Sequence, residues 1–332
     1  MAVTGLNHVG LSTPDLSRAL AFYRDALGFT ELMSFGWESG NPAADAGLGL
    51  TDTAAQVAVL TTGTSFLEVL HFDSPTPRRF DESPTVLREG IHRIGIAVRD
   101  LDAAWDLMMS AGATPGPDLP ADRSARTQLV RDPDGNIIEL ISQHALPAMA
   151  ELQPVVPHAT DSPSSELIPT GHGDVLLGIV LAGVTVTNPA IIDFYASAGL
   201  SPAQRIEWGD GNTPTSAAHA LMDRGESSLL SAGNAVLDFV HPVSPPALDR
   251  PVDARIIEWG FNHLCLDVDD IASTHRDLLA RGMTCFAPWT DMPGGNSAMG
   301  YALDPARVPV ELLEHRNAKS FMWPGRLSGV VQ

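Results

Sequence analysis

The pattern of apolar and polar positions divides the chain into four similar units. In the first unit, residues 6–13 alternate as a strand does, and apolar residues then recur at helical spacing from Leu16 to Leu27. Residues 56–61 and 65–72 follow with the pattern of strands. The sequence therefore predicts a module made of one strand, one helix and several further strands.

The same order recurs three times along the chain. First strands are predicted at residues 92–98, 176–187 and 262–268, each followed by a helical apolar stripe and then by strands. In the third unit one of these later strands is expected around residues 219–222. The chain thus predicts four modules of one kind.

The two halves of the chain align with each other, which indicates a duplicated domain. Tyr23 and Tyr195 are 172 residues apart, and so are Glu139 and Glu311. A repeat of this length is too long for a solenoid unit. Between the halves lies a stretch rich in Pro, Ser, Thr and Ala, which predicts a linker. The expected organisation is a first domain at 1–144 (modules 1–73 and 90–144), a linker at 145–173, a second domain at 174–316 (modules 174–245 and 258–316) and a tail at 317–332.

Composition excludes several classes of partner. The net charge is −20, which argues against nucleic acids and anionic membranes. No apolar run is long enough to span a bilayer, and the N-terminus lacks the basic head and apolar run of a signal peptide. Two cysteines, Cys265 and Cys285, cannot form a disulfide framework. We therefore expect a cytoplasmic protein without membrane or nucleic-acid partners.

One phrase stands out chemically. At residues 132–141 a turn signal, DPDG, precedes an apolar strand with Glu139 in its middle, and residues 304–313 repeat the phrase around Glu311. A carboxylate in so apolar a strand is costly unless it is paired or bound to a metal.

These phrases resemble the vicinal oxygen chelate superfamily of glyoxalase, bleomycin-resistance and extradiol dioxygenase proteins. The resemblance implies an α+β fold in which four βαβββ modules form two open barrels. It also implies one divalent metal per active barrel, with ligands from the first strand (often His) and last strand (often Glu) of each module. The residues that carry it are His8-Val9-Gly10-Leu11, Pro14-Asp15-Leu16, Ala21-Phe22-Tyr23, Leu27-Gly28-Phe29, Gly95-Ile96-Ala97-Val98, Asp100-Leu101-Asp102, Asp132-Pro133-Asp134-Gly135-Asn136, Glu139-Leu140 and Asn262-His263-Leu264.

The strand phase tests which residues could be ligands. In the first strand Val9 and Leu11 form the helix-facing side, so His8 points into the barrel. By the same rule His263 points inward from the fourth module. The third module has no ionisable residue on its first strand.

The second module departs from the pattern. Arg93 takes the ligand position, where it cannot bind a cation but could hold a substrate carboxylate. His92 is one residue out of phase and points away unless a bulge re-aims it.

Combined within each half, these residues predict two candidate sites. One His with two carboxylates suits Fe²⁺, Mn²⁺, Zn²⁺ or Ni²⁺. The first half offers His8, Glu68 and Glu139, with His92 or water completing the set, and the second half offers Asp238, His263 and Glu311.

An enzyme is the favoured interpretation. Its metal would chelate two oxygens of a small organic substrate, aromatic or carboxylate-bearing, in lyase, isomerase, epimerase or dioxygenase chemistry. Glu68 or Glu139 would move the proton, and Arg93 would bind the substrate. The alternatives are an extradiol-type dioxygenase with its site in the second half, and a metal-free protein that binds or sequesters a small molecule. A homo-oligomer is compatible with all three.

Overall fold

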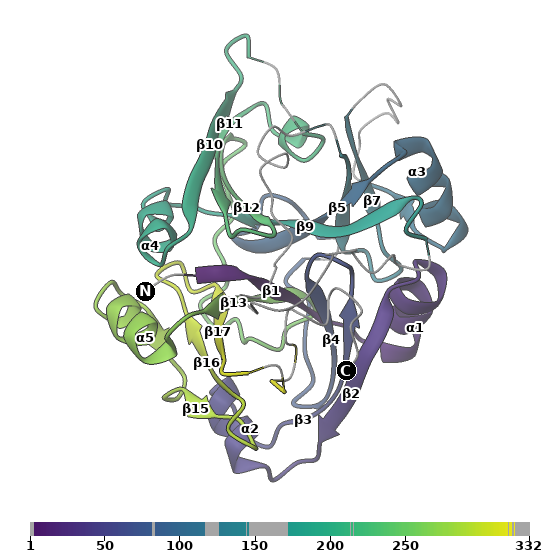
Figure 1. Ribbon diagram of the computed structural model, residues 1–332. Helices are drawn as coiled ribbons and strands as arrows, with labels where there is room; N and C mark the ends of the chain where they lie inside the picture. Colours follow the sequence, from purple (N-terminus) through teal and green to yellow (C-terminus); the bar gives the residue numbers. More distant parts are fainter. Residues whose placement is uncertain are drawn as a thin grey trace.

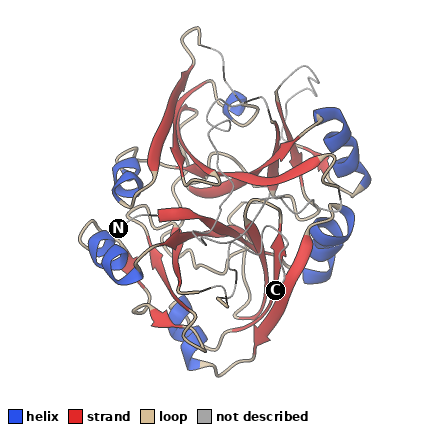
Figure 2. Ribbon diagram, viewed as in Figure 1, coloured by secondary structure: helices blue, strands red, loops and turns tan. Residues whose placement is uncertain are grey.

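The computed structural model describes residues 3–81, 84–116, 126–143, 145, 172–212, 214, 216–317, 319–320 and 322. Two strongly curved sheets lie one above the other in Figure 1, and Figure 2 shows most of the helices on their outer sides. The predicted linker falls almost wholly outside the described residues. None of the described helices is both long and apolar enough to cross a membrane.

Each module begins with a strand and a helix, as expected. The first contains β1 (Val3–Ser12), α1 (Leu16–Leu20), η1 (Ala21–Ala26), β2 (Thr30–Trp37), α2 (Pro42–Leu48), β3 (Ala54–Thr61) and β4 (Phe66–Ser74). The second contains β5 (Gly90–Val98), α3 (Leu101–Ser110), β6 (Thr114–Pro115), β7 (Thr127–Arg131) and β8 (Ile137–Ser142).

The later modules repeat this order. The third contains β9 (Leu176–Thr185), α4 (Ile191–Ser197), β10 (Ser201–Trp208), η3 (His219–Leu221), β11 (Arg224–Ser231) and β12 (Val236–Ser244). The fourth contains β13 (Gly260–Val268), α5 (Ile271–Leu279), β14 (Thr284–Cys285), β15 (Thr290–Asp291), β16 (Ser297–Leu303) and β17 (Pro309–His315). The strand expected at residues 219–222 is wrong, because this stretch is the short 3₁₀-helix η3.

The pairing of modules differs from the expectation. One sheet runs β14-β16-β17-β13-β1-β4-β3-β2, with β15 beside β16, and the other runs β10-β11-β12-β9-β5-β8-β7-β6. The first and fourth modules therefore form one barrel, the terminal barrel, and the second and third form the other, the central barrel. We expected residues 1–144 to form one barrel and residues 174–316 to form the other, and this expectation is wrong. All four first strands carry the same apolar phase, so this pattern does not specify which two of them pair.

Within each half of the chain, the two modules are nevertheless joined by a repeated contact between the barrels. Tyr23, on the helix of the first module, donates a hydrogen bond of 2.8 Å to Asp132 in the DPDG turn of the second. Tyr195 and Asp304 make the same bond, also of 2.8 Å, between the third and fourth modules. Each half of the chain thus repeats the same Tyr–Asp contact between the two barrels, and neither half forms a barrel by itself.

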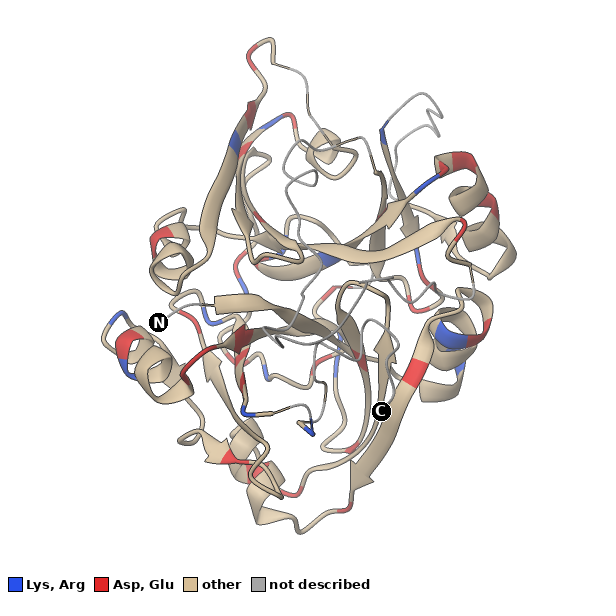
Figure 3. Ribbon diagram, viewed as in Figure 1, with Lys and Arg blue, Asp and Glu red and all other residues tan. Residues whose placement is uncertain are grey.

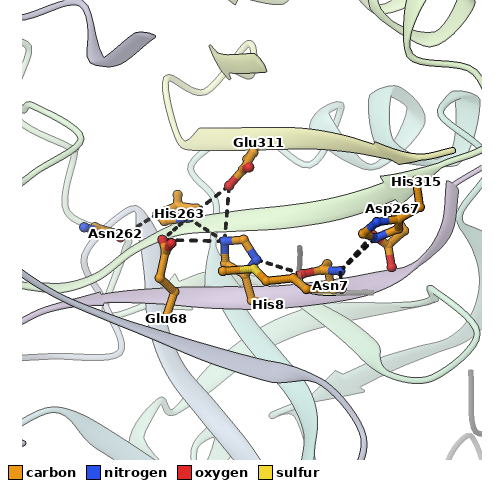
Figure 4. Close-up of polar contacts among 9 residues, drawn as sticks. Asn7, His8, Glu68, Asn262, His263, Asp267, Glu311 and His315 are labelled. Carbon is orange, nitrogen blue, oxygen red and sulfur yellow. Dashed lines mark hydrogen bonds and ion pairs between the residues drawn. The ribbon is translucent and has the colours of Figure 1, made fainter. Parts of the chain in front are cut away.

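The predicted strand phase is confirmed in β1. Val9 and Leu11 are fully buried in the main core together with Phe22. His8 occupies the opposite face of the strand and points into the terminal barrel (Figure 4).

Candidate metal centre

Four side chains with metal-ligating groups converge inside the terminal barrel (Figure 4). They are His8 on β1, Glu68 on β4, His263 on β13 and Glu311 on β17. The two histidine Nε2 atoms are 3.0 Å apart. Oε2 of Glu311 lies 3.2 Å from Nε2 of His8 and 3.5 Å from Nε2 of His263. Oε2 of Glu68 lies 3.7 Å from Nε2 of His8 and 3.4 Å from Nε2 of His263. None of the four residues is more than 4% exposed.

Two bulges in the ladder between β1 and β13 position the imidazoles. The register shifts between Leu6 and His8, and again where Leu11 pairs with Phe261, so that Asn7 and Asn262 are the extra residues. Oδ1 of Asn7 lies 2.9 Å from Nδ1 of His8. The fourth module repeats the contact, with Oδ1 of Asn262 2.8 Å from Nδ1 of His263. Each bulge therefore places an amide oxygen behind a histidine ring.

The hydrogen bonds of Asn7 determine the tautomer of His8. Nδ2 of Asn7 donates to Asp267 at 2.9 Å and to the carbonyl oxygen of Met322 at 3.1 Å. Oδ1 of Asn7 must therefore accept a proton from Nδ1 of His8. This leaves the Nε2 lone pair of His8 directed at the cluster, and the same contact behind His263 gives that ring the same orientation.

With both rings in their neutral form, the cluster has electron pairs but no protons between them. Two imidazole lone pairs face each other at 3.0 Å. Oε2 of Glu68 and both carboxylate oxygens of Glu311 are buried without a hydrogen-bond partner. Such an arrangement is repulsive on its own, and a divalent cation that prefers N and O donors removes the repulsion. The residues present therefore fit a metal ion.

The electrostatics agree with this interpretation. Burial acts to lower the pKa of His8, but the charges of Glu311 and Glu68 outweigh it and raise that pKa above its ordinary value. For Glu311 burial acts to raise the pKa, and the charges of His8 and His263 lower it. Burial raises the pKa of Glu68. The cluster favours a positive charge at its centre.

Two further side chains border the centre. Cys265 is fully buried, and its Sγ lies within 4.8 Å of ligand atoms of His8 and Glu311. The ring of Tyr301 on β16 stands edge-on to His263, with ring centroids 5.3 Å apart. Burial and then the charge of Glu311 raise the pKa of Tyr301 well above its ordinary value, so its hydroxyl stays protonated.

The C-terminal segment reaches into the same barrel. Met322 is fully buried against Phe66, Cys265 and Leu313. These three residues stand on inward-facing positions, two residues away from Glu68, His263 and Glu311 respectively.

The central barrel has an ion-pair cluster at the corresponding place. Arg93 is fully buried; its Nε donates to Glu139 at 2.8 Å, and its guanidinium also pairs with Asp238. His219 contacts the same Asp238 at 3.0 Å. The cavity that remains among these side chains is only about 10 Å³. A guanidinium here occupies the place of a metal ion between two carboxylates.

A bulge also re-aims His92, the exception allowed for in the sequence. The register between β5 and β9 shifts between Ile91 and Arg93. Nε2 of His92 accepts from the guanidinium of Arg93 at 2.5 Å, and Nδ1 lies 3.0 Å from the hydroxyl of Thr185. His92 is therefore a partner of Arg93 rather than a metal ligand.

The structure thus redistributes the predicted site residues. His8 and Glu68 from the first-half set meet His263 and Glu311 from the second-half set. The other four candidates, Glu139, His92, Arg93 and Asp238, belong to the central barrel, so neither predicted ligand set exists as a unit.

Asn7 and Asn262 were missed by the sequence reasoning. The signal was present, because the dipeptide Asn-His occurs only twice in the chain, at His8 and at His263.

Comparison with known proteins agrees with this fold. Residues 5–140 match the family described as the Glyoxalase/Bleomycin resistance protein/Dioxygenase superfamily. An ethylmalonyl-CoA/methylmalonyl-CoA epimerase from Cereibacter sphaeroides is 34% identical over 111 residues, which are 32% of this chain and 71% of that protein. The chain belongs to this superfamily.

Solved structures share the whole two-barrel architecture. Glyoxalase I from Zea mays is 15% identical, and the match covers 93% of this chain and 92% of that one with a TM-score of 0.58. A putative dioxygenase from Bacillus subtilis is 12% identical, with coverages of 97% and 89% and a TM-score of 0.58. At these identities the likeness shows the fold alone.

Proposed function

We propose that this chain is a metal-dependent enzyme with one catalytic centre, in the terminal barrel, that moves a proton on a small organic substrate. The observation that carries the proposal is the convergence of four side chains with metal-ligating groups, His8, Glu68, His263 and Glu311. These residues would hold a divalent metal, which would supply Lewis-acid stabilisation of negative charge on the oxygens of the substrate.

Glu68 is our candidate for the group that moves the proton. Its carboxylate is held less closely than that of Glu311, at 3.4 and 3.7 Å from the imidazoles. Burial raises its pKa toward the range in which a carboxylate can both accept and release a proton. Glu139, the other carboxylate considered for this role, is paired with Arg93 in the central barrel.

The reaction class favoured by this site is isomerisation, epimerisation or lyase chemistry. Oxygen-activating iron sites of the two-histidine, one-carboxylate kind keep positions open for O₂ as well as for substrate, and a fourth protein donor removes one of them. An extradiol-type site on His263, Glu311 and Asp238 is not supported, because Asp238 lies in the other barrel. The relative from Cereibacter sphaeroides is named an epimerase, which is a proton-transfer activity.

Arg93 has a different role from the one expected. Its guanidinium is occupied by Glu139 and Asp238, so it does not bind a substrate carboxylate in the terminal barrel. The substrate instead has to reach a centre beside which Met322 packs against Phe66, Cys265 and Leu313.

Elemental analysis of purified protein tests the proposal. We expect one divalent ion per chain, lost in both His8→Ala and His263→Ala, because each removes a donor from the shared centre. His92→Ala is the matched control, since it removes a buried histidine from the central barrel and should leave the metal content unchanged. Equal metal content in wild type and His8→Ala would refute the proposal.

Activity is tested separately. Ethylmalonyl-CoA and methylmalonyl-CoA are the first substrates to assay, because the relative's name says that it acts on them. Exchange of the substrate's acidic proton with deuterated water is the readout. We expect exchange to be lost in Glu68→Gln, and exchange at the wild-type rate in that variant would exclude Glu68 as the base.

A further inference from the structure

A second cavity lies where the two barrels meet, outside the metal centre. Its volume is about 80 Å³, enough for several water molecules or one small oxyanion. The wall comes from both barrels and includes His92 and Asn262, and the rest comes mainly from the connections that follow β4 and β12. These connections touch each other through a bridge between Arg88 and Leu248.

The cavity wall is rich in arginine, although the chain has a net charge of −20. In Figure 3 the ribbon at acidic residues is red in both barrels, and fewer positions are blue for basic residues. Four arginines and three carboxylates line the cavity: Arg79, Arg88, Arg250, Arg255, Asp81, Glu89 and Glu258.

The three carboxylates of the wall are already bound to other groups. Asp81 pairs with Arg88, and Glu258 pairs with Arg255. Glu89 accepts from the backbone and the hydroxyl of one residue, Thr187. None of them forms an ion pair with Arg79 or Arg250, although Glu258 and Glu89 act on Arg250 at longer range.

Arg79 and Arg250 have no ion pair with any described residue. The guanidinium of Arg250 stacks over the ring of Phe80, 5.4 Å from its centroid, and a ring face supports a cation without neutralising it. Burial lowers the pKa of Arg250 to about 10, and it outweighs the charges of Asp304, Glu258 and Glu89, which act to raise that pKa.

Asn262 contributes an amide donor to the cavity wall. It is 5% exposed, and its Oδ1 is held by His263. Its Nδ2 donates to none of the described residues, whereas Nδ2 of the equivalent Asn7 has acceptors on Asp267 and Met322. Because Asn262 lines this cavity, its amide can donate to an acceptor bound there.

We propose that the cavity is a binding site for a small oxyanion, a phosphate or carboxylate group, held by Arg79, Arg250 and Asn262. Two guanidinium groups and one amide N–H are donors only, so they suit an acceptor-rich anion and exclude a metal cation. The site is distinct from the metal centre and does not depend on the proposed reaction.

Isothermal titration of the purified full-length chain with inorganic phosphate, and separately with malonate, tests the proposal and distinguishes phosphate from carboxylate. Loss of one charge-assisted contact costs about 1.5–3 kcal/mol, so Arg250→Met should weaken binding by at least about 10-fold. Arg79→Met should weaken it in the same direction. Arg276→Met is the matched control, because that arginine is 73% exposed on α5, and it should bind as the wild type does.

Circular dichroism spectra show whether each variant is folded, and Arg250→Lys, which keeps the charge, should recover part of the affinity. Should Arg250→Met fail to fold, Arg79→Met and Arg250→Lys carry the test. An anion that binds the metal centre instead would bind Arg250→Met and Arg79→Met unchanged. That result overturns the proposal. The proposal is also overturned if the wild type binds neither anion at concentrations up to about 10 mM, because a dissociation constant above that value is too weak for a specific site.

Discussion

The terminal and central barrels use the same inward positions for different chemistry. The position of His8 in β1 and His263 in β13 carries Arg93 in β5 and Leu181 in β9. Both barrels bury two carboxylates on their last strands. In the terminal barrel they face two imidazoles, and we propose a metal ion among them, whereas in the central barrel a guanidinium supplies the positive charge. On this proposal, one ligand position decides whether a barrel binds a cation.

Glycines show that the two barrels accommodate these side chains in the same way. A Cβ at Gly10 would lie 2.1 Å from the ring of His263, and a Cβ at Gly183 would lie 2.2 Å from the guanidinium of Arg93. Each glycine faces the bulky inward residue of the neighbouring first strand. The two barrels thus share the glycine on one first strand, and they differ in the side chain that packs against it, which is His263 in one barrel and Arg93 in the other.

Removing Arg93 should have the largest effect on stability. Arg93→Met leaves Glu139 and Asp238 buried without their counter-charge, a change that costs about 3–5 kcal/mol. Urea unfolding of metal-loaded protein measures this loss. Arg205→Met, which removes an exposed pair, is the control and should change stability by less than about 1 kcal/mol. A near-neutral Arg93→Met would show that the central barrel does not depend on its ion pair.

Chelation should come next and should act through the terminal barrel alone. At free metal of about 100 times its dissociation constant, removing the ion lowers the free energy of unfolding by about 2.7 kcal/mol. The same decrease is expected in Arg93→Met protein, because its substitution lies in the other barrel. Unchanged unfolding midpoints with and without chelator would contradict a structural contribution from the metal.

Loss of an amide behind a histidine should weaken metal binding without abolishing it. Asn7→Ala frees the ring of His8 to rotate and to change tautomer, which should reduce metal affinity by about 10- to 100-fold. Thr185→Val is the matched control, because it removes the contact behind His92 in the central barrel. Metal titration of both variants separates the two cases, and equal affinities would show that Asn7 does not position its histidine.

The smallest effect should appear in the pH dependence of stability. Burial, and then the charge of Arg93, lowers the pKa of His92 well below its ordinary value. The unfolded chain therefore binds a proton below about pH 6.5 that the folded chain does not, and stability falls as pH decreases there. His92→Asn should remove this contribution, which is at most about 1.4 kcal/mol per pH unit. Identical pH profiles of wild type and His92→Asn would exclude it.

Much of this arrangement could be predicted from local pattern. The alternation of Val9 and Leu11 correctly placed His8 inside a barrel, and the DPDG phrase located the last-strand carboxylates. What failed was the assignment of partners. Strand phase says which face a residue occupies, but it says nothing about which other module lies opposite, so Glu139 was grouped with His8 instead of with Arg93.

The orienting asparagines were missed for a related reason. In a regular strand Asn7 and His8 point to opposite faces, and only a bulge brings the amide to the ring. The allowance for such a bulge at His92 proved correct, but it was not extended to the other modules.

The most direct test of the account is the location of the metal, by anomalous diffraction from metal-loaded crystals at the absorption edge of the bound element. The account predicts a single anomalous peak between His8, Glu68, His263 and Glu311, with none between Arg93, Glu139 and Asp238. A peak in the central barrel, or the absence of a peak between the two histidines in fully loaded protein, would contradict it.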